Sequence, residues 1–451
     1  MRPSADRRRG RVDLSRGVAP LGLLIALAPV GLAAQGEAHP PVPGKIDTVT
    51  LEEAVQRAML HSAQLAQTLA SVANAGSARL RAKGSLLPTV SLSSGASVNS
   101  AERFDPNTQR VVSGSSDSYS AGVNANYQLF AGGRKYFELN RARAAEVEAE
   151  ARLLTQRYAV IFQTNTLFVN ALRQSDLAAV AEASVERAEQ SLQITRARLQ
   201  VGSATRSDTL RTRLELANAR QTLLQARNQL RAARFALGRQ VGVSGPVAPE
   251  PPTEIDPAPL ALSEAEIVAL AETASPAVQA ARAASESARH SQASARSSFL
   301  PSLSASSNYS WANQERSVRG GSASWSLRLS GSFQVFDGFA RDLGLAQASE
   351  NRKVALLAEE DARRGVRQEV DAALRALETQ EQAIAIAEEA RLVAQEDLRI
   401  NQVRYEADAA PILEVVTSMV ALSQAEANLV SARYDYVLAR AELESIVGRE
   451  L

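Results

Sequence analysis

The stretch LLPTVSLSSGASV, residues 86–98, returns as FLPSLSASSNYSW at residues 299–311, 213 positions later. In both copies an Ala-rich helical stretch ends at a Leu-Pro pair, and small polar residues then alternate with apolar ones. Proline stops a helix because it has no backbone N–H to donate, and it is tolerated as the first residue of a strand. The period of two that follows predicts a strand with one apolar and one polar face.

The same correspondence continues through the rest of the chain, at an offset of 206. Phe130 corresponds to Phe336, Arg198 to Arg404 and Asp208 to Glu414, and no gap is needed across this stretch. The offset falls from 213 to 206 between the strands, where a hairpin loop tolerates a change of length. A repeat this long predicts two structurally equivalent halves, each a rigid unit, rather than an array of small repeats.

Four strands are expected, at about residues 89–99, 118–130, 302–310 and 322–336. A length of about ten residues with alternating apolar and polar side chains suits a transmembrane barrel whose outside meets lipid and whose inside meets water. Aromatic residues such as Tyr127 and Trp325 lie near strand ends, where a membrane interface favours them. A soluble sandwich is the alternative, and the dominance of Ser, Asn and Gln on the polar face argues against it.

Long helices are expected after each strand pair. No proline interrupts residues 134–200 or 341–406, and about 65 helical residues at ~1.5 Å each span about 100 Å. Return helices from Arg206 and Ile412 carry small and large apolar residues at alternating spacings of three and four, which is typical of a coiled-coil seam. These residues are Leu216, Ala219, Leu223, Ala226, Leu230, Ala233 and Leu237, and then Leu422, Ala425, Leu429, Ala432, Tyr436, Ala439 and Leu443.

The chain is therefore expected to have four parts. Residues 1–34 place six Arg before an apolar run and small residues, an order that predicts an export signal peptide. The structural repeats are expected at residues 35–243 and 261–451. Between them, residues 244–260 hold six of the chain's 17 prolines and are expected to form an extended connector with no core of its own.

Charge and composition exclude several classes of protein. The whole chain has a net charge of +1, and removal of the signal's six Arg and two Asp leaves −3, so nucleic acid is not an expected partner. Cysteine is absent, which excludes disulfides and the Cys that anchors bacterial lipoproteins. No segment after the signal reaches 18 consecutive apolar residues, so no transmembrane helix is expected.

No residues in the sequence form a catalytic, cofactor-binding or metal-binding motif. His39, His61 and His290 are far apart, and neither an HExxH pair nor a GxxxxGK phosphate loop occurs. The chain is therefore not expected to be an enzyme or to need a cofactor, and an exported hydrolase is disfavoured.

Four strands are too few to close a barrel. The smallest transmembrane barrels have eight strands, and an open edge in hydrocarbon leaves backbone groups unpaired at several kcal/mol each. Two copies would give a filled interior, whereas three copies give 12 strands around a lumen. The expected fold is an α+β membrane protein: a homotrimer with a 12-stranded transmembrane β-barrel that continues into a long periplasmic α-helical coiled-coil barrel.

In these features the sequence resembles the TolC-like outer-membrane efflux protein family, the exit ducts of drug pumps and type I secretion systems. The resemblance covers the LEEAV start at residues 51–55, both Leu-Pro strand starts, the Phe-x-Gly turns at 130–132 and 336–338, and both long helix pairs. It implies a duct in the outer membrane with a periplasmic extension. The partners it implies are outer-membrane lipid, a periplasmic adaptor (membrane fusion) protein and an inner-membrane pump of RND or ABC type.

The resemblance also implies a closed periplasmic entrance where the long and return helices meet, around residues 202–208 and 408–414. By resemblance, Tyr405 bonds Asp208 on the neighbouring hairpin and holds this entrance shut. A second tie of the family uses an Arg, which Ala410 replaces here, and the position of its partner holds Ser207.

A ring of acidic residues at the constriction is a further feature that the resemblance implies. Glu414 matches the first acidic position, and Thr417 stands at the second. Clustered carboxylates in a narrow mouth sum their fields and attract cations. Structural roles are the alternatives for single residues. Glu414 would then be a solvated carboxylate, Tyr405 a packing residue, and Arg198 and Arg404 donors to helix C-terminal carbonyls.

A periplasmic coiled-coil scaffold or adaptor without its own pore is the alternative function. Such a protein would also contain long helical hairpins. Adaptors, however, place one hairpin inside a small β-domain and lack two equal halves with lipid-facing strands.

Overall fold

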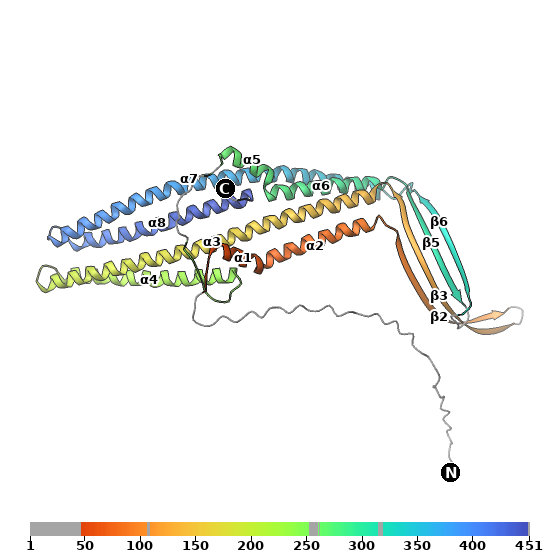
Figure 1. Cartoon of the computed structure of the whole chain (residues 1–451), viewed down its shortest axis with the longest axis horizontal. Coiled ribbons are helices and arrows are strands. Elements are labelled where there is room, and N and C mark those ends of the chain that lie inside the picture. The colour runs from red at the N-terminus through yellow and green to blue at the C-terminus, as the bar shows by residue number, and fades with distance from the viewer. Residues whose placement is uncertain (1–46, 106–108, 252–259, 261, 314–318, 450–451) are drawn as a thin grey trace, which may run out of the picture. The chain divides into compact units, whose positions relative to one another are not determined.

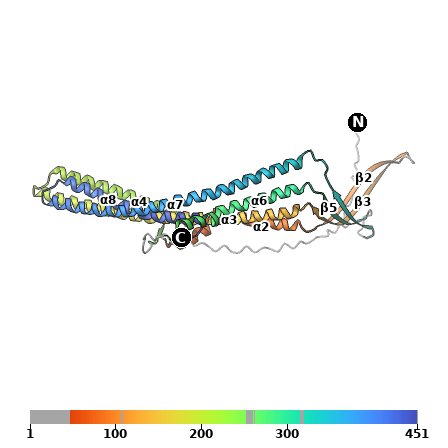
Figure 2. The same cartoon turned by 90° about the horizontal axis from the view of Figure 1, so that it is seen from above.

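The computed structural model describes residues 47–105, 109–251, 260, 262–313 and 319–449. The chain divides into Met1–Lys45 and Ile46–Leu451, and all described elements belong to the second unit. The expected signal peptide at residues 1–34 lies outside the described residues. Figure 1 shows the elements coloured along the chain, and Figure 2 shows them turned by 90°.

The two halves contain the same helices at repeat-related positions. The first half has α1 (Leu51–His61), α2 (Ala63–Gly84), α3 (Arg134–Gln200) and α4 (Arg206–Gln240). The second half has α5 (Glu264–Ala274), α6 (Pro276–Ser297), α7 (Ala340–Glu406) and α8 (Ile412–Val447). The offset of 213 carries α1 and α2 onto α5 and α6, and the offset of 206 carries α3 onto α7, at both ends of each helix.

Each half is organised around one long helix and its return helix. Helices α3 and α7 have 67 residues each, which at ~1.5 Å per residue is about 100 Å. Helix α4 packs along α3 and α8 along α7, so that each pair forms a hairpin. The apolar ladder of α8 is buried in its hairpin throughout, whereas Leu223 and Leu230 of α4 are only partly buried.

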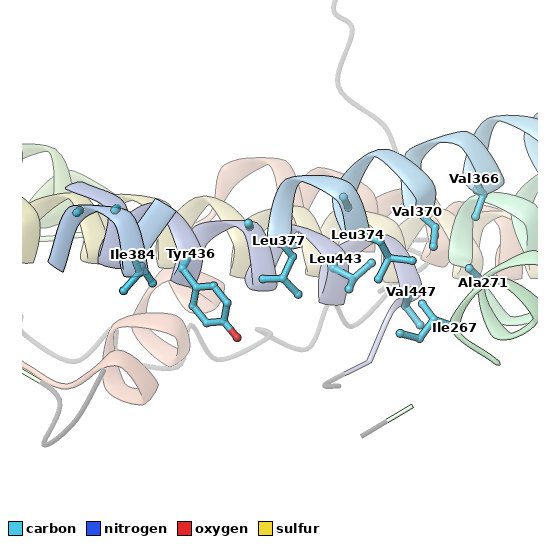
Figure 3. Close-up of a cluster of buried hydrophobic side chains, with 14 of the residues drawn as sticks. Ile267, Ala271, Val366, Val370, Leu374, Leu377, Ile384, Tyr436, Leu443 and Val447 are labelled. Atoms are coloured by element: carbon cyan, nitrogen blue, oxygen red, sulfur yellow. The ribbon is translucent and has the colours of Figure 1, made fainter. Parts of the chain in front are cut away.

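The largest buried cluster lies in the second half, among α5, α6, α7 and α8. Ile267 of α5, Leu374 and Leu377 of α7 and Leu443 of α8 lie side by side in it (Figure 3). Full burial of one such side chain contributes about 1.5–3 kcal/mol. This cluster therefore fixes the short helices of the second half against its long hairpin.

The strands form one antiparallel sheet in the order β2-β3-β5-β6. They are β2 (Thr89–Asp105), β3 (Arg110–Ala131), β5 (Ser302–Asn313) and β6 (Ser322–Ser332). Strands β3 and β5 pair directly, so the two halves share one sheet. The outer strands β2 and β6 are the two edges of this sheet.

The strand lengths differ from those expected from the sequence. The first hairpin is longer, since β2 continues to Asp105 and β3 begins at Arg110, and β5 continues to Asn313. The last strand was expected to reach residue 336 and ends at Ser332. Its partner strand explains the difference, because Ser332 pairs with Ser302, the first residue of β5.

Residues 244–260 were expected to form an extended connector with no core of its own, and one segment of it packs against the first half. Strand β4 (Val247–Pro249) pairs in parallel with β1 (Asp47–Val49). Val49 and Val247 are fully buried against Leu237 and Phe168 of the first hairpin. This pair therefore joins the connector to the start of the chain's first half. Among the described helices, none combines the length and the apolarity needed to cross a bilayer.

Candidate functional site

The two helix turns at the expected entrance have the same backbone form but different residues. The first turn, at 201–205, passes through Gly202 with φ +81°, and the second, at 407–411, passes through Asp408 with φ +57°. Glycine adopts positive φ freely, and Asp is among the few other residues that tolerate it. The repeat places Asp408 where the first half has Gly202, so a carboxylate is added at the second turn.

Asp208 is used within its own helix. Its side chain accepts hydrogen bonds from the backbone N of Thr205 at 2.9 Å and from Thr205 Oγ1 at 2.7 Å. Asp208 N in turn donates to Thr205 Oγ1 at 3.2 Å, which completes a capping box at the start of α4. This carboxylate therefore orders the first turn.

Glu414 stands at the equivalent position of α8 but cannot form the same cap. The N-cap residue is Pro411, which has neither an N–H nor a hydroxyl group. The Glu414 carboxylate instead accepts a hydrogen bond from Arg404 Nη1 at 2.9 Å, an ion pair within the second hairpin. The positive charge of Arg404 reduces the field that Glu414 can present to a passing cation.

Arg198 crosses from the first hairpin to the second. Its Nη1 donates to the carbonyl oxygen of Glu406 at 3.0 Å, its Nη2 donates to Asp408 Oδ1, and its guanidinium lies 4.8 Å from the centre of the Tyr405 ring. Glu406 is the last residue of α7, where the helix dipole is negative. Arg198 therefore ties α3 to the end of α7 and to the second turn by three interactions.

Tyr405 has a packing role in this structure. It is 8% exposed and belongs to a cluster of apolar residues from all four long and return helices, including Leu192 of α3, Leu216 of α4 and Met419 of α8. Its hydroxyl oxygen is buried and makes no hydrogen bond with the described residues. The expected hydrogen bond to Asp208 is not made, because that carboxylate is held by Thr205.

The expectation for the two repeat-related arginines holds for one of them. Arg198 binds a helix C-terminal carbonyl, as expected, but that of the other hairpin. Arg404 binds the side chains of Asn401 and Glu414 instead of a carbonyl. The repeat-related positions therefore differ in which hairpin their side chains reach.

The remaining entrance residues make fewer contacts. Ser207 is exposed on the first turn of α4, and Ala410 is partly buried in the second turn. Thr417 is exposed, and its Oγ1 donates to the carbonyl oxygen of Leu413 at 2.9 Å. The structure thus brings Tyr405 and Glu414 onto one hairpin and Ser207 and Asp208 onto the other, with Arg198 as the link.

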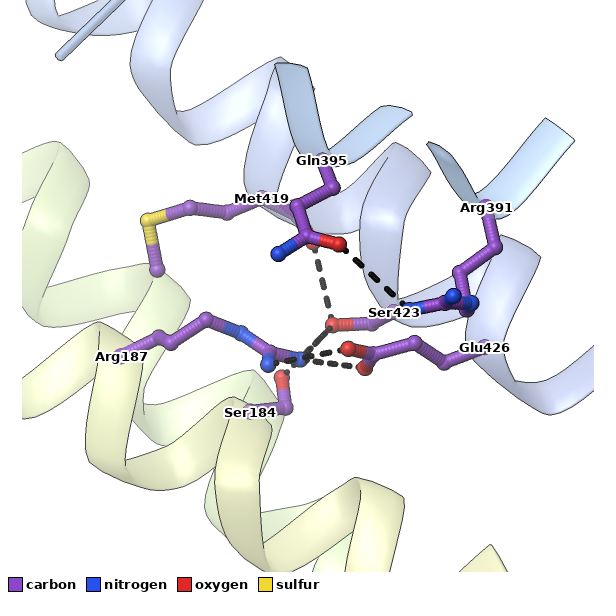
Figure 4. A network of polar contacts seen from close by, with 7 residues as sticks. All are labelled: Ser184, Arg187, Arg391, Gln395, Met419, Ser423 and Glu426. Atoms are coloured by element: carbon purple, nitrogen blue, oxygen red, sulfur yellow. Dashed lines mark hydrogen bonds and ion pairs between the residues drawn. The ribbon is translucent and has the colours of Figure 1, made fainter. Parts of the chain in front are cut away.

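A second set of polar contacts joins α3 to α8 further from the turns. Arg187 binds Glu426 through two hydrogen bonds, of 2.7 and 3.3 Å, and also donates to Ser423 Oγ at 3.2 Å (Figure 4). Ser423 donates to Ser184 of α3 at 3.2 Å. About four-fifths of both charged side chains is buried, so the pair is screened less than a surface pair.

Two more contacts extend this line along α3 and α8. Arg173 binds Asp435 at 2.9 Å, and the hydroxyl of Tyr434 donates to Asp176 at 2.7 Å. Burial, together with the hydrogen bond to Asp176, raises the pKa of Tyr434, so the phenol stays protonated and continues to donate at neutral pH. A row of polar contacts therefore holds the two hairpins together.

A groove of about 460 Å³ lies beside this row, between α3, α4 and α8. Its lining is mainly Ala, Ser, Thr, Asn and Gln and includes Glu215 of α4. Burial raises the pKa of Glu215, and a hydrogen bond from Asn218 opposes that shift. Glu215 is thus a carboxylate that is only partly solvated.

Sequence reasoning missed Arg198 as the link between the hairpins, and it missed Asp408. A signal for Asp408 was present, because the repeat aligns it with Gly202 in a turn that requires positive φ. A residue other than Gly there costs about 1–2 kcal/mol unless something compensates. The Arg187–Glu426 contact carried no such signal, because many charged residues of either sign lie along both helices.

The sequence matches the family described as outer membrane efflux protein over residues 54–243 and 267–449. The two matched segments coincide with the two halves of the structure. Comparison with curated proteins gives no match.

Solved structures with the same fold share little sequence with this chain. A membrane protein from Pseudomonas aeruginosa is 20% identical, with a TM-score of 0.78 over 90% of this chain and 91% of its own. The CmeC outer membrane channel of Campylobacter jejuni is 16% identical, with a TM-score of 0.78 over 88% and 85%. The outer membrane protein VceC from Vibrio cholerae is 16% identical, with a TM-score of 0.77 over 89% and 96%.

Proposed function

Because this chain belongs to the outer membrane efflux protein family, we propose that it is an exit duct that partners open at its periplasmic end. The protein resides in the outer membrane and has a periplasmic extension. In the proposal, the sheet of β2, β3, β5 and β6 lies in the membrane, and the hairpins α3–α4 and α7–α8 extend the duct into the periplasm.

The observation that carries this proposal is a four-stranded sheet with two edge strands and an exposed apolar face. Leu327 and Leu329 of β6 and Leu92 of β2 are all more than three-fifths exposed. A continuous apolar surface that extends over several neighbouring strands is unfavourable in water and favourable in lipid. The polar residues next to them in the sequence, such as Ser93 and Arg328, point to the opposite face of the sheet, because successive side chains of a strand alternate.

The sheet is proposed to close as a homotrimer. Two open edges in hydrocarbon are costly, and pairing each with an edge of another copy removes both. Three copies give a 12-stranded barrel with a lumen, and the paired helices continue it as an α-helical barrel. The proposed partners are a periplasmic adaptor and an inner-membrane pump of RND or ABC type, which would supply the energy for transport.

The entrance of the duct is proposed to lie at the two helix turns. Arg198 holds the second turn by its contacts with Glu406 and Asp408, and Tyr405 supplies a rigid apolar base. Asp208 and Ser207 lie on the opposing turn, and Glu414 supplies negative charge that Arg404 partly neutralises. Opening requires the second hairpin to move away from the first, which breaks the contacts of Arg198.

The experiment is a planar-bilayer recording of the purified protein, with efflux complementation in cells that lack their own duct. The proposal expects discrete conductance steps and restored export of toxic compounds only when an adaptor and pump are present. A protein that extracts into water without detergent, and that adds no conductance, would instead favour the coiled-coil scaffold.

A further inference from the structure

The polar face of the sheet carries one charged side chain. Arg328 is the only charged residue in four described stretches, namely 89–98 of β2, 118–131 of β3, 302–313 of β5 and 322–332 of β6. The other residues on its face of these stretches are mainly Ser, Asn and Gly. Within these stretches, any field from a full side-chain charge therefore comes from Arg328.

The strand pairing shows which residues share the face with Arg328. Arg328 pairs with Ser306 of β5, and Ser306 pairs with Asn126 of β3. Asn126 pairs in turn with Thr89 of β2. Residues directly opposite each other in antiparallel strands have their side chains on the same face. Arg328 therefore stands at the end of a row of hydroxyl and amide side chains that crosses the whole sheet.

The charge of Arg328 is not neutralised. Its side chain is exposed and makes no hydrogen bond or ion pair with the residues that the structure describes. Two other arginines line a pocket of about 300 Å³ at the start of β5 and the end of β6, and both have a carboxylate partner. Arg341 binds Asp337 at 2.8 Å, and Arg134 lies 3.7 Å from Glu138. Arg328 thus differs from them in presenting its full charge.

Closure of the proposed barrel leaves this charge free. Strand β6 is an edge of the sheet, and β2, the other edge, has no carboxylate in residues 89–98 to bring to it. In a transmembrane barrel the polar face of each strand points into the lumen. Three copies related by a three-fold axis therefore place three Arg328 side chains at one level around the bore.

The repeat does not double this ring. The counterpart of Arg328 in the first half, 206 positions earlier, is Gly122 of β3. A Cβ at Gly122 would lie 3.2 Å from the carbonyl oxygen of Tyr309, so a long side chain there would be crowded from its first atom. The cations of the bore therefore come from the second half alone.

We propose that Arg328 sets the ion preference of the duct. Its three copies form a ring of cations in the membrane part of the bore, and this ring favours the passage of anionic solutes over cationic ones. Rings of Arg or Lys select anions because their fields add up in a narrow mouth with low-dielectric walls. The inference rests on the proposed duct and homotrimer, and it adds the selecting residue and the chemical class of solute.

This ring is separate from the acidic position at the entrance. Glu414 lies just after the second helix turn, at the far end of the 67-residue helix α7 from the sheet. A solute that enters from the side of the sheet therefore reaches Arg328 without passing Glu414.

A structural role for Arg328 makes a different prediction. An inward-pointing charge on an edge strand discourages wrong pairing of free sheets. In that role the charge acts before the barrel closes and gives the finished bore no ion preference. Its removal would then lower the yield of assembled protein, while the protein that does assemble would conduct with the ion preference of the wild type.

The reversal potential in a KCl gradient across a planar bilayer tests the proposal on the full-length protein. It gives the ratio of chloride to potassium permeability. Arg328→Lys keeps the charge and is expected to keep the wild-type ratio. Arg328→Gln is expected to lower the ratio severalfold, and Arg328→Glu is expected to lower it further. The effect should fade from roughly 0.1 M to roughly 1 M salt, since the Debye length falls from about 10 Å to about 3 Å.

A charge swap separates the charge from its position in the chain. Arg328→Ser/Ser306→Arg exchanges two paired residues, so the composition is unchanged and the cation moves by one strand spacing, about 5 Å, on the same face. The swap is expected to restore the wild-type ratio, whereas Arg328→Ser alone should behave like Arg328→Gln. A swapped variant with the ratio of Arg328→Ser would contradict a ring that acts by its charge.

Block by citrate is a second measurement. Citrate is a small multivalent anion, and it is added on the side of the sheet. The citrate concentration that halves the current is expected to rise about tenfold or more in Arg328→Gln. Ser326→Gln, two residues away on the same face, is the control for side-chain volume and should be blocked like the wild type. Equal block of all three proteins would overturn the proposal.

The two proposals can be told apart by these recordings. Discrete conductance steps with one permeability ratio for the wild type, Arg328→Gln and Arg328→Glu would leave the duct standing and refute the role of Arg328. No conductance from the wild type would refute the duct, and the inference with it.

Discussion

Arg198 at the end of α3 donates a hydrogen bond to Asp408 in the turn between α7 and α8, and this ion pair joins the two hairpins at their tips. Asp408 occupies a backbone position that glycine fills in the other half, with φ +57° against +81° at Gly202. Asp408 therefore occupies this position although a residue other than glycine is disfavoured at positive φ. In the proposed duct the two hairpins separate when the entrance opens, and this contact would then hold the closed state.

Replacing Asp408 by Asn tests the charge of this contact without changing the backbone preference, because Asn also tolerates positive φ. Asp408 is largely exposed, so the loss is about 1 kcal/mol per chain, which shifts an opening equilibrium roughly fivefold. We expect a higher resting conductance of the Asp408→Asn duct in planar bilayers. Asp371→Asn, on an exposed face of α7, is the control, and an increase of the same size there would refute the role of Asp408.

Replacing Tyr405 by Phe is expected to leave the resting conductance unchanged. The bond to Asp208 that the family resemblance implies would make the conductance rise when it is lost, but the hydroxyl of Tyr405 is buried without a hydrogen-bond partner among the described residues. Removing an unsatisfied buried hydroxyl is neutral or stabilising by about 1 kcal/mol. Thermal unfolding and bilayer recordings check both parts. A conductance that rises in Tyr405→Phe as much as in Asp408→Asn would restore the hydrogen-bond account.

Charge changes at Glu414 and Arg404 are expected to act in opposite directions. The two side chains form an ion pair at 2.9 Å, so each weakens the field of the other. Glu414→Gln is expected to weaken block of the duct by multivalent cations, and Arg404→Gln is expected to strengthen it. Both are measured as the cation concentration that halves the current. Block that is the same in both variants and in the wild type would place this pair outside the constriction.

Replacing Leu327 by Asp tests which face of the sheet meets lipid. Leu327 lies on the exposed apolar face of β6, and a carboxylate there is expected to cost up to about 2 kcal/mol per chain near the middle of the membrane. The yield of heat-resistant oligomer in outer-membrane fractions should fall. Arg328→Asp places the same charge on the other face of the same strand and should assemble normally. The reverse result would exchange the two faces.

Glu215 provides a prediction about pH. Burial raises its pKa in the folded protein, so the charged form costs stability above that pKa. As the pH falls through this raised pKa, the folded protein takes up the proton first and the cost disappears. We therefore expect Glu215→Gln to unfold at a higher temperature than the wild type at pH 8, with a smaller difference at pH 5. Glu186→Gln, at an exposed position of α3, should show no gain at pH 8.

The sequence predicted the helices better than the strands because helix ends are marked locally. The pairs Pro88 and Pro301, and the uninterrupted runs behind Gly133 and Phe339, place the helix ends of both halves close to the observed ones. The end of β6 is not marked in this way, since it depends on where β5 begins: Ser332 pairs with Ser302, the first residue of β5. Val247 was missed for a similar reason: its burial depends on Val49, 198 positions earlier.

The positions of the two helix turns could be predicted from the sequence, but the side-chain contacts at them could not. The repeat located both turns, and Tyr405, Asp208 and Glu414 do lie at them. The direction of a long side chain is decided by its tertiary neighbours, so the repeat could not distinguish Arg198, which crosses to the other hairpin, from Arg404, which does not. Likewise, the capping box of Asp208 depends on Thr205, which is replaced in the second half by Pro411.

The central claim is that four strands per chain oblige this protein to assemble around a water-filled bore. Single-particle electron microscopy of the protein purified in detergent tests it most directly. We predict particles of three copies with a closed sheet at one end, helices at the other and an axial channel between them. Particles made of single subunits, or a ring whose centre is filled along its whole length, would contradict the account.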